Sequence, residues 1–294
     1  MKVLITGATG MLGRATFERL SREPGASVSG LCHSRVSPGL HRADLTDLDS
    51  IAPLLDSLAP DAIVHTAAIR KPDEFAANAA ASRRLNVDAT AAIARWIAAH
   101  PDTRLVYISS DYVFNGTAAP YSTDAPLHPA NSYGQSKADG ELVLRDIAPA
   151  QSAILRVPIL YGDVASLDES SVTSVITAVQ KRSPVVLDDW AIRYPTHVAD
   201  VADILAQMVS RRLVGTYHWS GLEPFTKYDM GLEIARQIGS DPALLRRSGA
   251  PANGSEPRPK DCHLDRSALE SLGVTTPGIP FTEGIRRILT RFPG

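Results

Sequence analysis

A glycine-rich turn near the amino terminus places the tightest constraint on the fold. A short apolar run at residues 2–6 leads directly into Gly7-Ala8-Thr9-Gly10-Met11-Leu12-Gly13, where the helical pattern of residues 11–21 begins. Glycines at this spacing allow a tight turn, a close backbone approach to a phosphate and a helix packed closely on a strand. The amino terminus of that helix adds partial positive charge. The strand–turn–helix context therefore predicts a dinucleotide-phosphate site at Gly7, Thr9, Gly10, Met11, Leu12 and Gly13.

The rest of the first half alternates short apolar strands with amphipathic helices. Strands are predicted at residues 27–32, 61–65, 104–109 and 153–157, and helices at 48–58, 79–100 and 137–146. This alternation implies βαβ units, right-handed crossovers and a parallel sheet. The predicted fold class is therefore α/β, with an NAD(P)-binding Rossmann domain over residues 1–156.

The pattern loosens after Val157, where Pro158, Gly162 and the serine-rich residues 166–174 interrupt it. Helices are predicted at 198–209 and 228–238, with a short strand at 216–219. We expect residues 157–294 to form mainly a smaller, mixed substrate-binding lobe. Residues of about 188–212 are expected to return to the Rossmann domain.

Composition excludes several classes of protein. The 294 residues carry a formal net charge of −2, without the basic face or tail of a nucleic-acid-binding protein. No apolar run is long enough to span a membrane. Cys32 and Cys262 lie far apart, which fits a reducing cytoplasm. The eight histidines form no close cluster, so we predict no metal site.

The end of the second predicted strand bears on the choice of dinucleotide. An acidic residue there would bind the ribose hydroxyls, but the sequence reads Cys32-His33-Ser34-Arg35. Arg35 can pair with a 2′-phosphate and Ser34 can donate its hydroxyl, which favours NADP(H). The alternative is that Arg35 is a solvated loop charge. Asp44, beside Leu45, is predicted to contact the adenine, with a turn-capping role as the alternative.

A tyrosine and a lysine four residues apart supply the predicted catalytic chemistry. Tyr133 and Lys137 share one face if both are helical, and a nearby ammonium is expected to lower the phenol pKa. The phenol can then exchange a proton while hydride moves to or from a nicotinamide. Ser110, after an apolar strand, is placed to hold the reacting oxygen. Asn86 is either part of a water relay to Lys137 or a helix-packing amide.

These motifs together resemble the extended short-chain dehydrogenase/reductase superfamily. The resemblance rests on the glycine turn, on His65-Thr66-Ala67-Ala68 and on Tyr133-x-x-x-Lys137. Residues 110–116 (SDYVFNG), followed by Pro120-Tyr121, resemble the narrower dTDP-4-dehydrorhamnose reductase group. Motifs of the second half are similar to a branch that includes the regulatory beta subunit of methionine adenosyltransferase: residues 155–162, 193–198, 218–221 and 258–259.

The resemblance implies a role for each matching residue. Tyr133 would be the general acid, Lys137 would position the nicotinamide ribose, and Ser110 would bind the substrate oxygen. The remaining matches fall into three groups: Ala67 and Ala68 close to the cofactor, Asp111 and Tyr112 at the sugar, and Arg193 and Arg258 at a nucleotide-sugar diphosphate. Lobe-bridging ion pairs are the alternative for both arginines.

Two departures from the family pattern affect the predicted function. Ile159 stands where rhamnose-type reductases usually carry a tryptophan, which removes a sugar-stacking surface. The sequence ends at Gly294, without the longer tail of the beta subunit, which argues against a regulatory role. The predicted function is an NADPH-dependent reductase of a nucleotide-linked 4-keto-6-deoxy sugar, acting as a monomer or homodimer. The alternative is an NADP-binding regulatory subunit whose partner is a methionine adenosyltransferase catalytic subunit.

Overall fold

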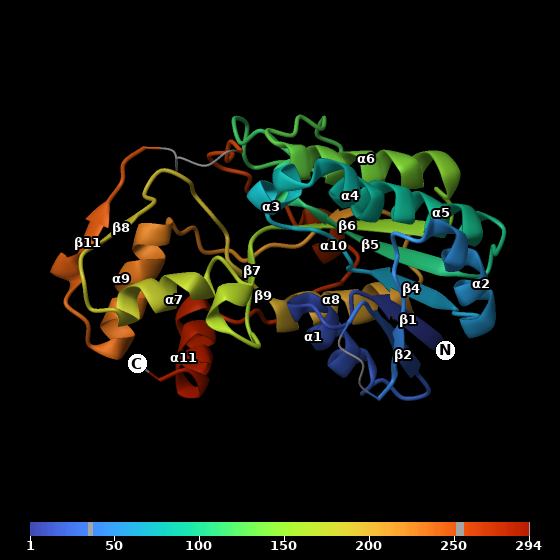
Figure 1. Ribbon diagram of the computed structural model, residues 1–294, viewed down its shortest axis with the longest axis horizontal. Helices are drawn as coiled ribbons and strands as arrows, with labels where there is room; N and C mark the ends of the chain where they lie inside the picture. Colours follow the sequence, from blue (N-terminus) through green and yellow to red (C-terminus); the bar gives the residue numbers. More distant parts are fainter. Residues whose placement is uncertain (35–37, 251–255, 294) are drawn as a thin grey trace.

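The computed structural model describes residues 1–34, 38–250 and 256–293, and its centre is a seven-stranded sheet (Figure 1). The strand order is β10-β6-β5-β4-β1-β2-β3, and every neighbouring pair is parallel. The predicted α/β fold is confirmed. The strands are β1 (Lys2–Thr6), β2 (Ser27–Cys32), β3 (Leu40–Arg42), β4 (Ala62–His65), β5 (Arg104–Ser110), β6 (Ser152–Val157) and β10 (Gly215–His218).

Alternate residues of the strands face two separate layers of helices. Val3 and Ile5 of β1 pack in a core with α1 (Met11–Leu20) and α8 (Val198–Ser210). Leu4, between them, points to the other core, because successive side chains of a strand leave the sheet on opposite faces. That second layer consists of α2 (Leu48–Leu58), α5 (Ala89–Ala98) and α6 (Ser132–Ile147). Both faces of the sheet are therefore covered.

The strand order reverses at β1, which pairs with β2 on one side and β4 on the other. In open α/β sheets a ligand crevice lies outside the carboxyl ends of the strands at such a point. Gly7 follows β1 with a φ of +66°, and a β-carbon there would lie 2.8 Å from the Ala67 α-carbon. Glycine is thus required where the two chain segments meet.

The helix predicted over residues 79–100 is confirmed from Ala79 to Ala98, but it contains a π-helical turn that the sequence did not predict. This helix consists of α4 (Ala79–Arg83), a π-helical turn over Arg84–Asp88 and then α5, and the short α3 (Pro72–Ala77) precedes it. Asn86 in that turn accepts from the Ile69 amide at 2.8 Å and donates to the Ile69 carbonyl at 2.9 Å. This pairing holds the widened turn against the loop that follows β4. Such π turns frequently occur at functional sites.

Most of the later elements pack around a third core (Figure 1). Its helices are α7 (Thr173–Gln180), α9 (Lys227–Ile238) and α11 (Phe281–Arg291). Two small parallel sheets pair β7 (Leu160–Tyr161) with β9 (Thr196–His197), and β8 (Val185–Leu187) with β11 (Leu245–Arg247). The short helices are η2 (Asp111–Val113), η3 (Leu167–Glu169), η4 (Pro242–Leu244) and α10 (Ser267–Glu270).

The predicted limits of the two domains stay a prediction, although α8 does lie on the main sheet. Among the described residues, no helix has the length and apolar character needed to cross a membrane.

Candidate active site

The start of α6 positions the predicted tyrosine and lysine. Asn131 caps the helix by accepting a hydrogen bond from the Gly134 amide at 2.9 Å, so Tyr133 lies in the first turn and Lys137 one turn later. The Tyr133 ring meets the Tyr112 ring edge-on, with centroids 6.1 Å apart. The helix therefore brings Tyr133 to the residues that follow the carboxyl end of β5.

Ser110, the last residue of β5, links the members of this cluster. Its hydroxyl donates to the Asp111 carboxylate at 3.0 Å and accepts from the Tyr112 amide at 3.2 Å. Ser110 also lies within hydrogen-bonding reach of the Tyr133 hydroxyl. The structure thus brings Ser110, Asp111 and Tyr133 together, and their catalytic and sugar-binding roles stay predictions.

The expected lowering of the Tyr133 pKa is wrong. Burial raises the pKa of Tyr133, the hydrogen bond with Ser110 opposes the rise, and the Asp111 charge adds to it. The nearby cation that opposes the rise is Arg70. Tyr133 is therefore a neutral phenol near pH 7, which is the form that can donate a proton.

Lys137 is buried, and its Nζ lies 4.0 Å from the centroid of the Tyr107 ring. Burial lowers the pKa of Lys137 to about 7, against the opposing influence of the Glu141 carboxylate one turn away. Near neutral pH the amine is consequently present in both protonation states. That behaviour is unusual for a lysine and typical of functional sites.

The glycine turn has the shape and the donors of an anion site. A β-carbon at Gly13 would lie 2.2 Å from the Gly7 carbonyl oxygen, so the helix can approach the strand this closely only with glycine there. Gly10 is exposed, and α1 begins after it without an acidic residue in its first turn. The first amides of a helix lack partners within the helix and favour negative charge. These residues fit a dinucleotide pyrophosphate.

Fewer of the predicted contacts to the adenine and the 2′-phosphate can be assessed in the structure. Asp44 accepts from the amide and the hydroxyl of Thr46, at 2.9 and 2.7 Å, so it caps a turn, the alternative that the sequence left open. These hydrogen bonds lower the Asp44 pKa. Ser34 is exposed at the end of β2, and Leu45 is buried. Arg35 lies outside the described residues, so the 2′-phosphate contact stays a prediction, as does the adenine contact.

Asn86 behaves as a packing amide. Besides its two bonds to Ile69, its amide nitrogen donates to the Ser136 hydroxyl on α6 at 3.1 Å. The side chain therefore ties the loop after β4 to the helix that carries Tyr133. The same loop contains Ala67, whose amide donates to the Thr6 hydroxyl at 3.2 Å, and the partly exposed Ala68.

Three cationic side chains, Arg193, Arg258 and Lys227, lie near Tyr112 or near one another. Arg193 is buried, donates to the carbonyls of Ile192 and Pro259, and lies with its guanidinium 5.8 Å from the Tyr112 ring. Burial raises the pKa of Asp111 to about 6, and the Arg193 charge opposes this rise. Arg193 and Asp111 are therefore close enough to influence each other.

Arg258 forms an ion pair between the two halves of the chain, which the sequence analysis gave as the alternative to diphosphate binding. It pairs at 2.6 Å with Asp73 of α3, far away in the sequence. Lys227, at the start of α9, is a residue that sequence reasoning missed. Burial lowers the Lys227 pKa, and the charges of Arg193 and Arg258 lower it further, while Asp188 raises it. No sequence motif marks Lys227, because only the fold brings it to the two arginines.

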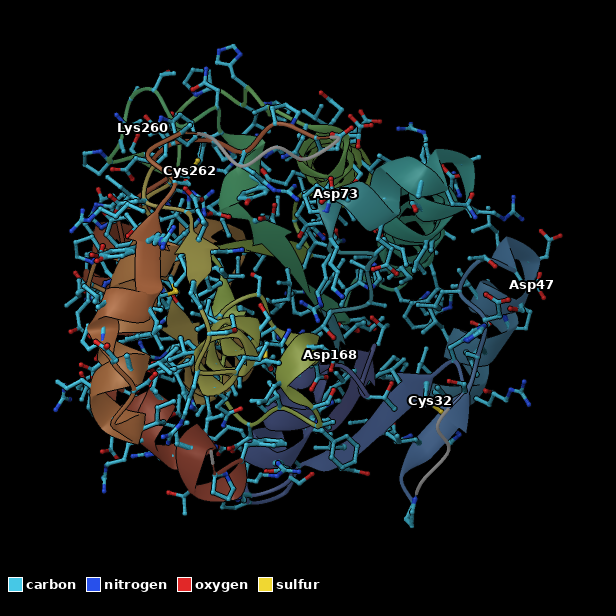
Figure 2. The ribbon with its side chains drawn as sticks, turned by 60° about the vertical axis from the view of Figure 1, so that its left-hand side comes forward. Cys32, Asp47, Asp73, Asp168, Lys260 and Cys262 are labelled. Carbon is cyan, nitrogen blue, oxygen red and sulfur yellow. The ribbon has the colours of Figure 1, made fainter. Side chains whose placement is uncertain are left out.

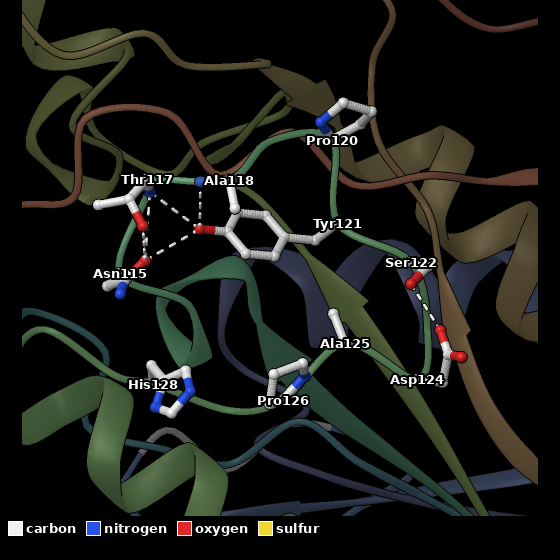
Figure 3. Close-up of a pocket in the computed structure, with 10 residues that line it drawn as sticks. All are labelled: Asn115, Thr117, Ala118, Pro120, Tyr121, Ser122, Asp124, Ala125, Pro126 and His128. Carbon is white, nitrogen blue, oxygen red and sulfur yellow. Dashed lines mark hydrogen bonds between the residues drawn. The ribbon is translucent and has the colours of Figure 1, made fainter.

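A hollow of about 450 Å³ lies in the loop between η2 and α6 (Figure 3). The Tyr121 hydroxyl accepts from the Thr117 and Ala118 amides and donates to Asn115 at 3.0 Å. The hollow contains no predicted site residue. The Tyr121 backbone pairs with His263 and Asp265, which holds in place the segment that carries Arg258.

Comparison with known proteins identifies the family. The model of the RmlD substrate binding domain family matches residues 1–293. The chain belongs to this family. One relative of this RmlD-family chain, the methionine adenosyltransferase 2 subunit beta of Mus musculus, is 40% identical over 299 residues, which cover 99% of the chain and 88% of the relative. The dTDP-4-keto-6-deoxy-D-glucose reductase of Streptomyces niveus is 31% identical over 278 residues, covering 92% and 91%.

Solved structures confirm the fold of the RmlD-family chain. The dTDP-4-dehydrorhamnose reductase of Bacillus anthracis, in complex with NADP, superposes with a TM-score of 0.85 at 24% identity, covering 99% of both chains. The UDP-glucose 4-epimerase of Thermus thermophilus, in complex with NAD, superposes with a TM-score of 0.84 at 23% identity, covering 100% of this chain and 99% of that chain.

Proposed function

We propose that the chain is an NADPH-dependent reductase of a nucleotide-linked 4-keto-6-deoxy sugar. The observation that carries the proposal is the proximity of Ser110 to Tyr133 at the carboxyl edge of the sheet that also carries the glycine turn, with the buried Lys137 one helical turn after Tyr133. The similarity to a Streptomyces keto-sugar reductase and to the fold of an NADP-bound reductase supports it.

In this proposal the dinucleotide, when bound, supplies a hydride to the keto carbon. Ser110 holds the keto oxygen, and Tyr133 donates the phenolic proton to that oxygen, because its raised pKa keeps it protonated. Lys137 would hold the nicotinamide ribose. Arg193, Arg258 and Lys227 would bind the diphosphate of the nucleotide sugar, since they bring positive charge to one side of the cluster.

NADPH consumption with dTDP-4-keto-6-deoxy sugars tests the proposal. Tyr133→Phe should reduce turnover by about 10²- to 10⁴-fold while NADPH still binds, because only the transferred proton is lost. Tyr217→Phe is the control, since its hydroxyl donates to the Val214 carbonyl on the edge of the sheet. If no 4-keto sugar is reduced while NADPH binds tightly, the reductase proposal fails.

A second candidate function rests on a separate observation. The chain is 40% identical, over nearly its full length, to methionine adenosyltransferase 2 subunit beta, and this identity exceeds the 31% to the Streptomyces reductase. In this function the chain binds NADP(H) and acts through a methionine adenosyltransferase catalytic subunit, with little catalysis of its own. Stable co-elution of the two purified proteins in size-exclusion chromatography would support it. Separate elution at micromolar concentration would count against it.

A further inference from the structure

One acidic residue of the second half reaches back to the glycine turn. The Glu169 carboxylate forms a two-pronged ion pair with Arg14 of α1, with Nη1–Oε1 at 2.8 Å and Nη2–Oε2 at 2.7 Å. The side chains are only 14% and 29% exposed. Forked pairs of this kind are geometrically specific and stronger than single contacts. Glu169 therefore holds the Arg14 guanidinium in one orientation.

Both walls of the predicted cofactor crevice contact Glu169. On one side, Arg14 also donates to the Thr9 carbonyl within the glycine turn at 2.7 Å. On the other side, Arg70, two residues beyond Ala68, donates to the backbone carbonyl of Glu169. Glu169 thus connects the loop after β1 with the loop after β4, between which the crevice opens.

The segment of residues 163–169, which we call the strap, is well anchored in this position. The Ala165 amide donates to Glu169 at 2.7 Å, and the Asp163 carbonyl accepts from Arg14 at 3.2 Å. Leu167 packs against the core that contains the first residues of α1. Figure 2 shows the part of the strap around Asp168 beside the blue amino-terminal elements.

The strap leaves room for a ligand on the turn itself. Gly10 remains exposed although Thr9, next to it, is bonded to Arg14. A pyrophosphate on the first amides of α1 would therefore lie beside the strap, with Arg14 and Arg70 at its margin. The two guanidiniums would add positive charge at the place where the ligand is most negative.

We propose that Glu169 is a positioning residue for the dinucleotide, which fastens the strap across the crevice and so slows release of the bound cofactor. The inference rests on the proposed binding of NADP(H). It differs from the mechanism above because Glu169 acts through two arginines and does not touch the reacting atoms.

Stopped-flow measurement of NADPH dissociation from the full chain tests the inference. Glu169→Gln should release NADPH at least tenfold faster than the wild type, because a neutral amide cannot hold both prongs of Arg14. Asp203→Asn is the matched control. Asp203 pairs with Arg19 on the same helix, away from the glycine turn, so its variant should release NADPH at the wild-type rate.

The other possible NADPH release rates also decide whether the strap proposal holds. An unchanged release rate in Glu169→Gln overturns the strap proposal, and slower release overturns it in favour of Glu169 competing with phosphate for the arginines. If Glu169→Gln does not fold, Arg14→Lys keeps the charge but loses the fork and should also release NADPH faster. If the wild type binds no NADPH, the proposed cofactor and the strap proposal both fail. If the wild type binds NADPH and Glu169→Gln releases it at the same rate, only the strap proposal fails.

Discussion

The Arg156 guanidinium and the Glu141 carboxylate form a fully buried ion pair, with Nε–Oε1 at 2.8 Å and Nη2–Oε2 at 2.7 Å. Glu141 lies on α6 one turn after Lys137, and it also accepts from the Ser109 hydroxyl at 2.6 Å. Ser109 is the neighbour of Ser110. The pair therefore holds the helix that carries Tyr133 against β5 and β6, the strands that it must face.

Removing one partner of this pair should destabilise the protein strongly. Glu141→Gln leaves Arg156 buried without its counter-charge, and the expected loss in free energy of unfolding is about 3–5 kcal/mol. Urea denaturation followed by circular dichroism measures it. Glu18→Gln, which removes an exposed pair with Arg22, should leave the unfolding midpoint in place. Equal midpoints for Glu141→Gln and the wild type would contradict the structural role of the buried pair.

Two glycines of the turn should respond differently to alanine. Gly13→Ala forces a β-carbon within 2.2 Å of a backbone oxygen, so we expect a loss of stability of roughly 1–3 kcal/mol from overpacking. Gly10→Ala places its β-carbon 3.3 Å from that oxygen and within 4 Å of no other atom, so the fold should survive while NADPH binding weakens. Thermal melts and fluorescence titrations separate the two effects. A Gly10→Ala protein that binds NADPH normally would argue against a phosphate at this turn.

The buried lysine predicts a pH dependence of stability. Because folding lowers the Lys137 pKa from 10.5 to about 7, the unfolded chain binds more protons between these values. The free energy of unfolding should therefore rise with pH across this window, and the penalty is fully present below about pH 7. Lys137→Met should remove this rise, whereas the exposed Lys181→Met should keep it. Urea denaturation at pH 7, 8.5 and 10 checks this, and parallel curves for Lys137→Met and the wild type would refute it.

The choice of dinucleotide can be tested at Arg35, a prediction from sequence alone. Arg35→Ala should weaken NADP binding by roughly 10- to 100-fold, as expected for the loss of charged hydrogen bonds to a 2′-phosphate. NAD binding should change little, because NAD lacks that group. Isothermal titration with both dinucleotides measures the ratio. An equal loss of affinity for the two would remove Arg35 from the 2′-phosphate site.

Sequence patterns predicted the elements whose signal is local. The glycine turn and the four-residue spacing of Tyr133 and Lys137 each lie within a single strand–turn–helix or helix start, where chain geometry follows from neighbouring residues. The π-helical turn within the helix predicted over 79–100 was missed, because it depends on the bonds of Asn86 to Ile69 across the fold. The helix α11 was missed too.

The sequence by itself determined the parallel α/β fold, the glycine-rich turn after the first strand and the choice of candidate catalytic residues, since these depend on short-range spacing and periodicity. The tertiary structure decided how those residues behave. Burial reverses the expected shift of the Tyr133 pKa, because desolvation outweighs the influence of any nearby cation. The tertiary fold also brings Glu169 to Arg14, 155 residues away, and Lys227 to Arg193. Such contacts arise only when distant segments pack together, and no local pattern encodes them.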